Sequence, residues 1–314
     1  MESIVPNQEY IIHLAAETGT GQSMYMVNKY NQTNIMGLSN LFQSILSSRN
    51  KSKVKKIILS SSRSVYGEGK YCCPKCGIIY PNSRDKHDLL VGDFDFYCSK
   101  CGSKLTLQPT TEDSEINPSS LYAYTKYAQE LMVKTMCVAL GIDYTIFRFQ
   151  NVYGVGQSLK NPYTGILSVF SSLMLENKPV NIFENGLESR DFINVKDISD
   201  GVIASIENER SNGETINLGF GINTSVLEIA EILKNHYKSS SEINITGDFR
   251  VGDIAHNKAD ITKAKQILGF VPKISLYDGL LEFCNWVEGQ DIDNSKYEQS
   301  LLEMEQVGMF YRRQ

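Results

Sequence analysis

The chain has 314 residues, of which 41% are hydrophobic and 21% charged, proportions that are ordinary for a water-soluble globular protein. Its 31 basic and 36 acidic residues give a formal charge of −5, which provides no basic surface of the kind that nucleic acids require. No apolar run is long enough to span a membrane, and no secretory leader is recognisable. We therefore expect a cytoplasmic protein with no nucleic-acid or membrane partner, organised as one large domain or two smaller ones.

Strand-like and helix-like segments alternate along the first half of the chain. A buried strand is expected at Tyr10–Ala16, a helix from about Gln22 to Ser47, and a second strand at Lys55–Ser61. After a break in the pattern, a long amphipathic helix begins behind Pro118 and runs to Ala139, and Tyr144–Phe149 has the character of a third strand. This alternation predicts an α/β fold, in which a parallel sheet is covered by helices on both faces.

The order of elements becomes mixed beyond residue 157. Helices are expected near Gly165–Leu175, Ser225–His236 and Leu276–Gly289, with short strands between them. This pattern predicts a smaller substrate-covering domain, residues 158–290, some segments of which return to the sheet. From Asp291 onward the chain is polar, and residues 291–314 are expected to form a loosely held tail.

The break in the pattern, residues 68–110, contains two Cys-x-x-Cys pairs with 21 residues between them, each followed by a glycine. Four thiolates at this spacing suit a structural zinc ion with no open coordination position, so we interpret the segment as a zinc-ribbon insertion. Two disulfides or free thiols are the alternatives, and a cytosolic setting disfavours disulfides. The predicted ligands, which exclude the adjacent Cys72, are Cys73, Cys76, Cys98 and Cys101.

Tyr122 and Lys126 lie one turn apart near the start of the long helix, where the ammonium can lower the pKa of the phenol. The spacing alone is weak, because it occurs four times in this chain. Only this pair opens a long helix behind Pro118, with Asn117 as a candidate cap. Ser62, at the end of the preceding strand, could hydrogen-bond the same substrate hydroxyl. These three side chains indicate hydride transfer between a sugar carbinol and a nicotinamide.

Several short motifs recur in the order and spacing of one known family. They are His13-Leu14-Ala15-Ala16, Ser60-Ser61-Ser62 with Val65-Tyr66-Gly67, Tyr122/Lys126, Arg148-Phe149-Gln150-Asn151-Val152-Tyr153-Gly154 and Ser189-Arg190-Asp191-Phe192. Together they resemble the extended short-chain dehydrogenase/reductase family of NAD-dependent nucleotide-sugar epimerases and dehydratases. The resemblance runs from about Tyr10 to Trp286. The cysteine-bearing insert and the run at residues 161–167 are similar to its dTDP-L-rhamnose 4-epimerase and UDP-glucose 4-epimerase branch.

The resemblance implies a Rossmann-like, doubly wound NAD-binding domain at residues 1–157 and a homodimer that acts on a nucleotide-diphosphate sugar. The dimer would pair the helices expected at Gln22–Ser47 and Pro118–Ala139. Tyr122 would take the proton from the sugar C4 hydroxyl, Lys126 would lower the tyrosine pKa and hold the nicotinamide ribose, and Ser62 would orient the hydroxyl. The other residues placed beside NAD are Leu14, Ala15, Ala16, Asn34, Ser60 and Ser61. The residues placed beside the substrate are Asn151, Arg190, Arg250 and Asp253.

The residues that follow Ser62 help to choose the reaction. Family dehydratases carry an Asp-Glu pair there and the decarboxylases keep a glutamate, whereas this chain has Arg63 and Ser64, to which no role is assigned. Without an acid to protonate a leaving hydroxyl, dehydration and decarboxylation are disfavoured. The leading hypothesis is a nucleotide-sugar 4-epimerase that acts on dTDP-L-rhamnose or another dTDP- or UDP-hexose. The alternatives are an NADPH-dependent 4-keto-sugar reductase and a cofactor-free binding remnant.

One part of such a domain is not found in the sequence, so the predicted sheet is N-terminally incomplete. In the family, three strands and a Gly-x-x-Gly-x-x-Gly turn, whose amides hold the dinucleotide pyrophosphate, precede the His-Leu-Ala-Ala strand. Gly19-Thr20-Gly21 comes after that strand and is no substitute. Either Met1 is an internal residue of a longer protein or cofactor binding has been lost. The first is favoured, because Tyr10–Leu14 would otherwise be a hydrophobic edge strand.

Overall fold

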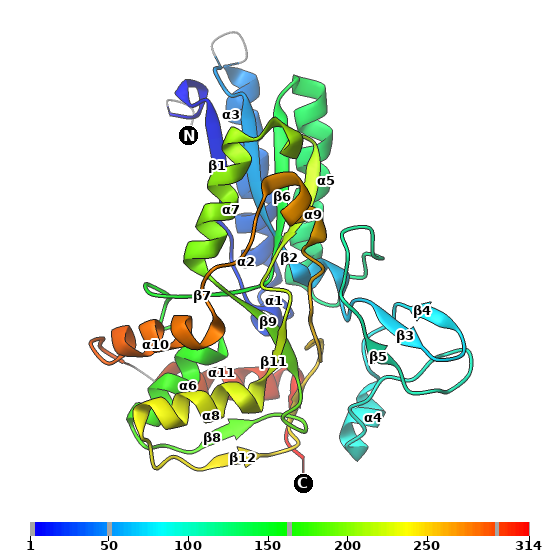
Figure 1. The fold of residues 1–314 in the computed structure, drawn as a ribbon, viewed down its shortest axis with the longest axis vertical. Coiled ribbons are helices and arrows are strands. Elements are labelled where there is room, and N and C mark those ends of the chain that lie inside the picture. The colour runs from blue at the N-terminus through cyan, green and yellow to red at the C-terminus, as the bar shows by residue number, and fades with distance from the viewer. Residues whose placement is uncertain (1–3, 49–51, 162–164, 293–294, 314) are drawn as a thin grey trace.

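The structure is a computed structural model that describes residues 4–48, 52–161, 165–292 and 295–313. Figure 1 shows an upper lobe built on a sheet, a lower lobe of helices and short strands, and an insertion that projects to one side. The sheet is parallel, and its four strands lie in the order β1 (Tyr10–His13), β2 (Lys56–Ser62), β6 (Asp143–Phe149) and β10 (Glu214–Leu218). The predicted α/β fold with a parallel sheet of the Rossmann type is therefore confirmed.

The alternating side chains of β2 explain why helices cover both faces of this sheet. Ile57 and Leu59 pack into a cluster with residues of the first covering layer, whereas Ile58 packs into a cluster on the opposite face. The first layer consists of α3 (Gly37–Ser47) and α5 (Leu121–Leu140). The opposite layer consists of α7 (Val195–Glu207) and α9 (Thr262–Leu268), whose segments come from the second half of the chain.

β1 differs from the buried strand that was expected. It is the edge strand of the described sheet, and Tyr10, Ile12 and Leu14 expose 42%, 42% and 59% of their surface. Ile11, on the other face, packs against the cluster beneath α3 and α5. The strand is exposed because only one of its edges, toward β2, carries a hydrogen-bonded neighbour among the described residues.

The helix expected from Gln22 to Ser47 is divided. It consists of α1 (Thr20–Ser23), α2 (Val27–Tyr30), a π-helical turn at Asn31–Met36 and α3. The wide π turn contains Asn34, whose side chain is turned inward to bind other parts of the lobe. Gly19, which follows the loop after β1, is the N-cap residue of α1.

The lower lobe covers the carboxyl ends of the sheet strands (Figure 1). Its core is formed by apolar side chains of three helices and of two paired strands. These elements are α6 (Ile166–Leu175), α8 (Val226–Tyr237), α10 (Leu276–Val287), β8 (Val180–Ile182) and β12 (Ile243–Ile245). A second small sheet, in the order β11 (Asn223–Ser225), β9 (Ser189–Asn194) and β7 (Asn151–Tyr153), connects the two lobes. Residues 162–164 of the run that resembles the rhamnose epimerase branch lie outside the described residues.

Residues 291–314 were expected to be a loosely held tail, and this expectation is wrong for the described part. Residues Ser295–Gln306 form helix α11, and Phe310–Tyr311 form strand β14, which pairs antiparallel with β13 (Phe249–Arg250). Met304 and Phe310 are 1% and 2% exposed. These few apolar side chains are enough to fix a segment whose remaining residues are polar.

The insertion forms a three-stranded antiparallel sheet and one short helix, which are β3 (Tyr71–Cys73), β4 (Gly77–Ile79), β5 (Thr106–Leu107) and α4 (Lys86–Val91). Arg84 joins it to the lower lobe through two hydrogen bonds to Glu184 and one of 3.3 Å to the carbonyl of Asp253. No helix in the described parts of the chain has the length and apolar character needed to cross a membrane.

Candidate active site

Two hollows meet where β2 and β7 end. A groove of about 690 Å³ runs along the carboxyl end of the sheet, and a cavity of about 180 Å³ extends into the lower lobe. Asn151 and Val152, from β7, line both hollows. The Oδ1 atom of Asn151 is buried and has no hydrogen-bond partner in the structure. An unpaired buried amide oxygen at this junction is free to bind a ligand.

Tyr122 and Ser62 are brought together at the junction of the groove with the sheet. Both line the groove, and Ser62 lies close enough to the phenol to lower its pKa. The long helix that carries Tyr122 begins at Leu121 and is capped by Ser120, whose hydroxyl accepts from the Ala123 N–H at 3.2 Å. The expected cap, Asn117, is therefore wrong, because Ser120 has the extended backbone that a cap requires.

A cation that was not expected, Arg63, acts on the phenol of Tyr122. Burial raises the pKa of its phenol, while the hydrogen bond with Ser62 and the charge of Arg63 lower it. Lys126 is buried and donates to Gln129 Oε1 at 3.1 Å, and burial lowers the pKa of its ammonium to about 8. In this structure the cation that lowers the phenol pKa is Arg63, a residue to which sequence reasoning assigned no role.

The residues predicted to contact NAD are only partly gathered in the groove. Its lining includes Leu14, Ala16, Ser60 and Ser61 together with Tyr122 and Lys126, but neither Ala15 nor Asn34. Ile12, Leu14, Val202 and Ile203 give the groove an apolar wall. An apolar groove with a lysine and hydroxyl groups at one end suits a nicotinamide ribose, so the residues present fit this half of the cofactor.

Asn34 holds the loop behind β1 in place. Its Oδ1 accepts from the Glu17 N–H at 2.8 Å, and its Nδ2 donates to the Glu17 carbonyl at 3.1 Å and to Thr125 Oγ1 at 2.9 Å. Gln129 Nε2 donates to the Asn34 carbonyl at 2.7 Å. Because its side-chain amide is bonded within the protein, Asn34 positions the groove wall and does not line it.

A buried ionic network fixes the strand that carries Ser62. Arg148 Nε and Nη2 donate to the carboxylate of Glu130 at 3.0 and 2.8 Å, and Ser61 donates to the same carboxylate. Arg148 Nη1 also donates to the Tyr66 hydroxyl at 2.8 Å, which donates in turn to Asn217 at 2.8 Å. The network thereby connects β2, α5, β6 and β10 directly behind the catalytic candidates.

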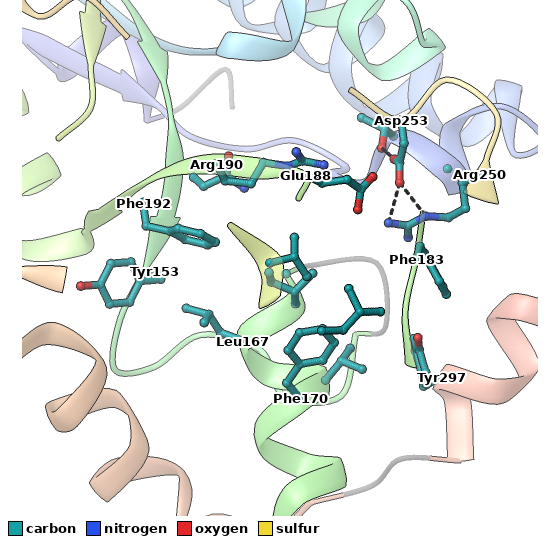
Figure 2. A pocket seen from close by; sticks show the side chains of 18 of the residues that line it. Tyr153, Leu167, Phe170, Phe183, Glu188, Arg190, Phe192, Arg250, Asp253 and Tyr297 are labelled. Carbon is teal, nitrogen blue, oxygen red and sulfur yellow. Dashed lines mark hydrogen bonds and ion pairs between the residues drawn. The ribbon is translucent and has the colours of Figure 1, made fainter. Parts of the chain in front are cut away.

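The predicted substrate residues line the second hollow, and Figure 2 shows three of them, Arg190, Arg250 and Asp253. Arg190 Nη1 donates to the carbonyls of Ser189 and Ala255 at 3.0 and 2.8 Å. Arg250 forms an ion pair with Asp253 at 2.7 Å (Figure 2), so Asp253 orients this guanidinium as well as lining the cavity. Two guanidinium groups that face one cavity match the chemistry of a diphosphate.

Several residues that line this cavity were not predicted from the sequence, and four of them are polar residues from separate elements. Thr20 is the first residue of α1, Arg63 follows Ser62, and Glu188 precedes Arg190 by two positions. Tyr297 comes from α11, which was expected to be an unstructured tail. Burial, together with the charge of Glu184, raises the pKa of the Glu188 carboxyl to about 8. Of the four, only Arg63 has a sequence signal, namely its position directly after the catalytic serine.

The four predicted metal ligands in the insertion are gathered in one place. The sulfur atoms of Cys73, Cys76, Cys98 and Cys101 all lie within 4.8 Å of one another. Cys72 is not part of this group. The two glycines that follow the Cys-x-x-Cys pairs, Gly77 and Gly102, have φ angles of +78° and +70°, which only glycine adopts easily.

A tyrosine and a lysine one turn apart, a serine at a strand end, a nicotinamide-sized groove and a cavity with two arginines define a dehydrogenase-like fold for nucleotide-linked sugars. The model of the NAD dependent epimerase/dehydratase family matches residues 2–83 and 98–219. The chain belongs to this family. Residues 84–97, which separate the two matched segments, lie within the insertion.

Individual relatives agree with this assignment. The chain is 37% identical over 286 residues to the dTDP-L-rhamnose 4-epimerase of Burkholderia thailandensis, an alignment that covers 91% of the chain and 76% of that protein. UDP-glucose 4-epimerase of Thermotoga maritima, solved with UDP-glucose, is 26% identical, with a TM-score of 0.72 over 91% of this chain and 81% of the other. UDP-glucuronic acid 4-epimerase of Bacillus cereus, solved with UDP-glucuronic acid and NAD, is 26% identical, with a TM-score of 0.71 over 91% and 77%.

Proposed function

We propose that this protein is an NAD-dependent nucleotide-sugar 4-epimerase. The observation that carries the proposal is that Tyr122 and Ser62 line the same groove, which Asn151 connects to the arginine-lined cavity. The nicotinamide of a cofactor in the groove and the sugar of a nucleotide sugar in the cavity would then lie next to each other at the Tyr122 phenol. The family membership and the 4-epimerases among the relatives support the same activity.

The groups of this chain handle the proton and the orientation of the sugar. Tyr122, as phenolate, takes the proton of the C4 hydroxyl, which Ser62 holds in position, and later returns it to the epimeric oxygen. NAD, when held in the groove, would supply the hydride acceptor and donor for C4 and would be regenerated in each cycle. Lys126 lies in the groove at the place where it would hold the nicotinamide ribose. Arg190 and Arg250 hold the diphosphate.

The best-supported substrate is dTDP-L-rhamnose. The 37% identity to an enzyme of that name favours it, and UDP-hexoses are the next class. Arg63 and Ser64 stand where a dehydratase would need acids, which disfavours loss of water from the sugar. An NADPH-dependent 4-keto-sugar reductase remains the second candidate, because Tyr122, Lys126 and Ser62 would serve it equally well.

Two measurements on the purified 314-residue chain test this function. Denaturation should release NAD(H), or added NAD should bind in a titration, and dTDP-L-rhamnose should then be converted to its C4 epimer in an NMR assay without net consumption of cofactor. Stoichiometric oxidation of NADPH with a 4-keto sugar would identify the reductase. A chain that neither holds nor binds NAD would contradict catalysis by this polypeptide alone and favour the binding-remnant hypothesis.

We further propose that Cys73, Cys76, Cys98 and Cys101 bind one structural zinc ion. The sulfur positions support this proposal, and four protein ligands leave no coordination position for substrate. Metal analysis should find about one zinc per chain, and Cys98→Ser should lose it. Cys72→Ser is the matched control and should keep the zinc, because this neighbouring thiol is outside the cluster. Zinc retained in the Cys98→Ser variant would contradict the proposed ligand set.

A homodimer and a cytoplasmic location remain part of the proposal. Val138 on α5 and Met36 in the π-helical turn are 74% and 56% exposed, as expected for helices that pair with a second copy. The mass of the protein in solution would decide between monomer and dimer.

A further inference from the structure

Arg63 occupies a position that the fold fixes closely. It is the first residue after β2 and opens a 3₁₀ turn (Arg63–Tyr66). Ser62 caps this turn, because its hydroxyl accepts from the Ser64 N–H at 3.2 Å and from the Ser64 hydroxyl at 3.0 Å. The next residue along the chain from the catalytic serine therefore has a defined backbone, and its side chain lines the cavity of the lower lobe.

The guanidinium of Arg63 makes no ion pair within the described part of the protein, although the more distant carboxylates of Asp253 and Glu68 raise its pKa. Its Nη1 atom is buried and makes no hydrogen bond, and no carboxylate lies within ion-pair distance. The other buried arginines differ in this respect. Arg84 is paired with Glu184, Arg148 with Glu130 and Arg250 with Asp253. A buried cation without a partner is costly, and proteins retain one where a ligand supplies the missing acceptors.

Its electrostatic neighbours place this guanidinium near the reacting phenol and near Arg190, one of the two predicted phosphate-binding arginines. The charge of Arg63 lowers the pKa of Tyr122. Burial and then the charge of Arg190 lower the pKa of Arg63 itself, to about 9. In a nucleotide-linked sugar, the part that lies between the reacting carbon and the diphosphate is the hexosyl ring with its oxygen substituents.

We propose that Arg63 is a specificity-determining residue whose guanidinium donates hydrogen bonds to the oxygen substituents of the hexosyl ring. The inference rests on the proposed function and adds to it a named contact for the sugar. The oxygen substituents on two neighbouring ring carbons can accept the two parallel N–H donors of a planar guanidinium. The diphosphate already has Arg190 and Arg250, so the sugar is the part of the substrate that lacks a cationic donor. By holding the ring, Arg63 keeps C4 at Tyr122.

The test compares binding of dTDP-L-rhamnose with binding of dTDP by calorimetry, for the wild type and for Arg63→Met. The variant should bind dTDP-L-rhamnose about 10- to 100-fold more weakly, as expected for a lost hydrogen bond to a charged group, and should bind dTDP with unchanged affinity. Arg63→Lys should recover only part of the loss, since an ammonium lacks the fork. Arg210→Met, at an exposed position far along the chain, is the matched control and should bind both ligands like the wild type.

A stability measurement separates contact with the sugar from a structural role. The thermal midpoint of Arg63→Met without ligand should equal or exceed that of the wild type, because the variant removes an unpaired buried charge. Equal weakening toward dTDP and dTDP-L-rhamnose would make Arg63 a diphosphate ligand and overturn the inference, as would unchanged binding of both. A wild-type protein that binds dTDP but no nucleotide sugar would instead overturn the proposed function, and the inference would fall with it.

Discussion

Replacing Tyr122 by phenylalanine should lower the turnover number for epimerisation by about 10²- to 10⁴-fold, the usual contribution of a positioned acid or base. The variant lacks only the phenolic hydroxyl of a ring that lines the groove. The ring, which packs edge-on against Tyr30 with centroids 6.5 Å apart, is preserved. Binding of the nucleotide sugar should therefore change little, since its diphosphate is held elsewhere. The measurement is the initial rate of conversion of dTDP-L-rhamnose with saturating NAD, alongside the dissociation constant of the substrate.

Tyr124 provides a matched control on the same helix. It lies two residues further along α5 and is 54% exposed, so its hydroxyl faces away from the groove and Tyr124→Phe should retain the full rate. The rate of the wild type should rise with pH, because the phenolate is the proton acceptor and burial raises the pKa of Tyr122. A Tyr122→Phe enzyme with the same rate and the same pH profile as the wild type would exclude Tyr122 as the acid–base group.

Replacing Glu130 by leucine should reduce the free energy of unfolding by about 3–5 kcal/mol, because it leaves the charge of Arg148 buried and unpaired. The side chains of Glu130 and Arg148 are 0% and 4% exposed, and the pair connects α5 to β6 behind the active-site strand. Ser61 would lose its acceptor at the same time. The measurement is urea unfolding followed by circular dichroism, with stability extrapolated to water.

Two further variants show whether burial is the cause of this loss. The double variant Glu130→Leu/Arg148→Met removes both charges and should recover much of the lost stability, because no unpaired ion remains. Glu9→Ala breaks an ion pair with Lys55 whose side chains are 50% and 61% exposed, and it should cost no more than about 1 kcal/mol. A double variant that is as unstable as Glu130→Leu alone would show that the loss arises from packing and not from the unpaired charge.

Local sequence pattern was sufficient to predict most of the elements that carry the site. β2 and β6 agree with their predicted ranges to within a residue, because both are apolar runs buried on two faces. The Cys-x-x-Cys spacing selected Cys73 and not Cys72, which agrees with the observed cluster. Such predictions succeed because each depends on neighbours in the chain or on one helical turn.

The predictions failed where a residue depends on a distant segment. The terminal residues 295–313 were predicted to be a loose tail because they are mostly polar. In the structure Phe310 pairs with Arg250, and Tyr297 lines the cavity. Asn34, predicted to lie beside the cofactor, stays a prediction, but sequence reasoning did not foresee that its amide is bonded to Glu17. The hydrophobic periodicity of either segment carries no information about these contacts, because each contact joins residues that are far apart in the sequence.

The sequence by itself determined the family, the parallel α/β sheet, and the identity of Tyr122, Lys126 and Ser62 as the candidate chemical groups, since these follow from motif order and helical spacing. Only the tertiary structure placed Arg63 near the phenol, where its charge lowers the phenol pKa, and left its Nη1 atom without a hydrogen-bond partner in the cavity. The physical reason is that the effect of a charge depends on distance and desolvation. Both quantities are set by segments that meet only when the two lobes fold together.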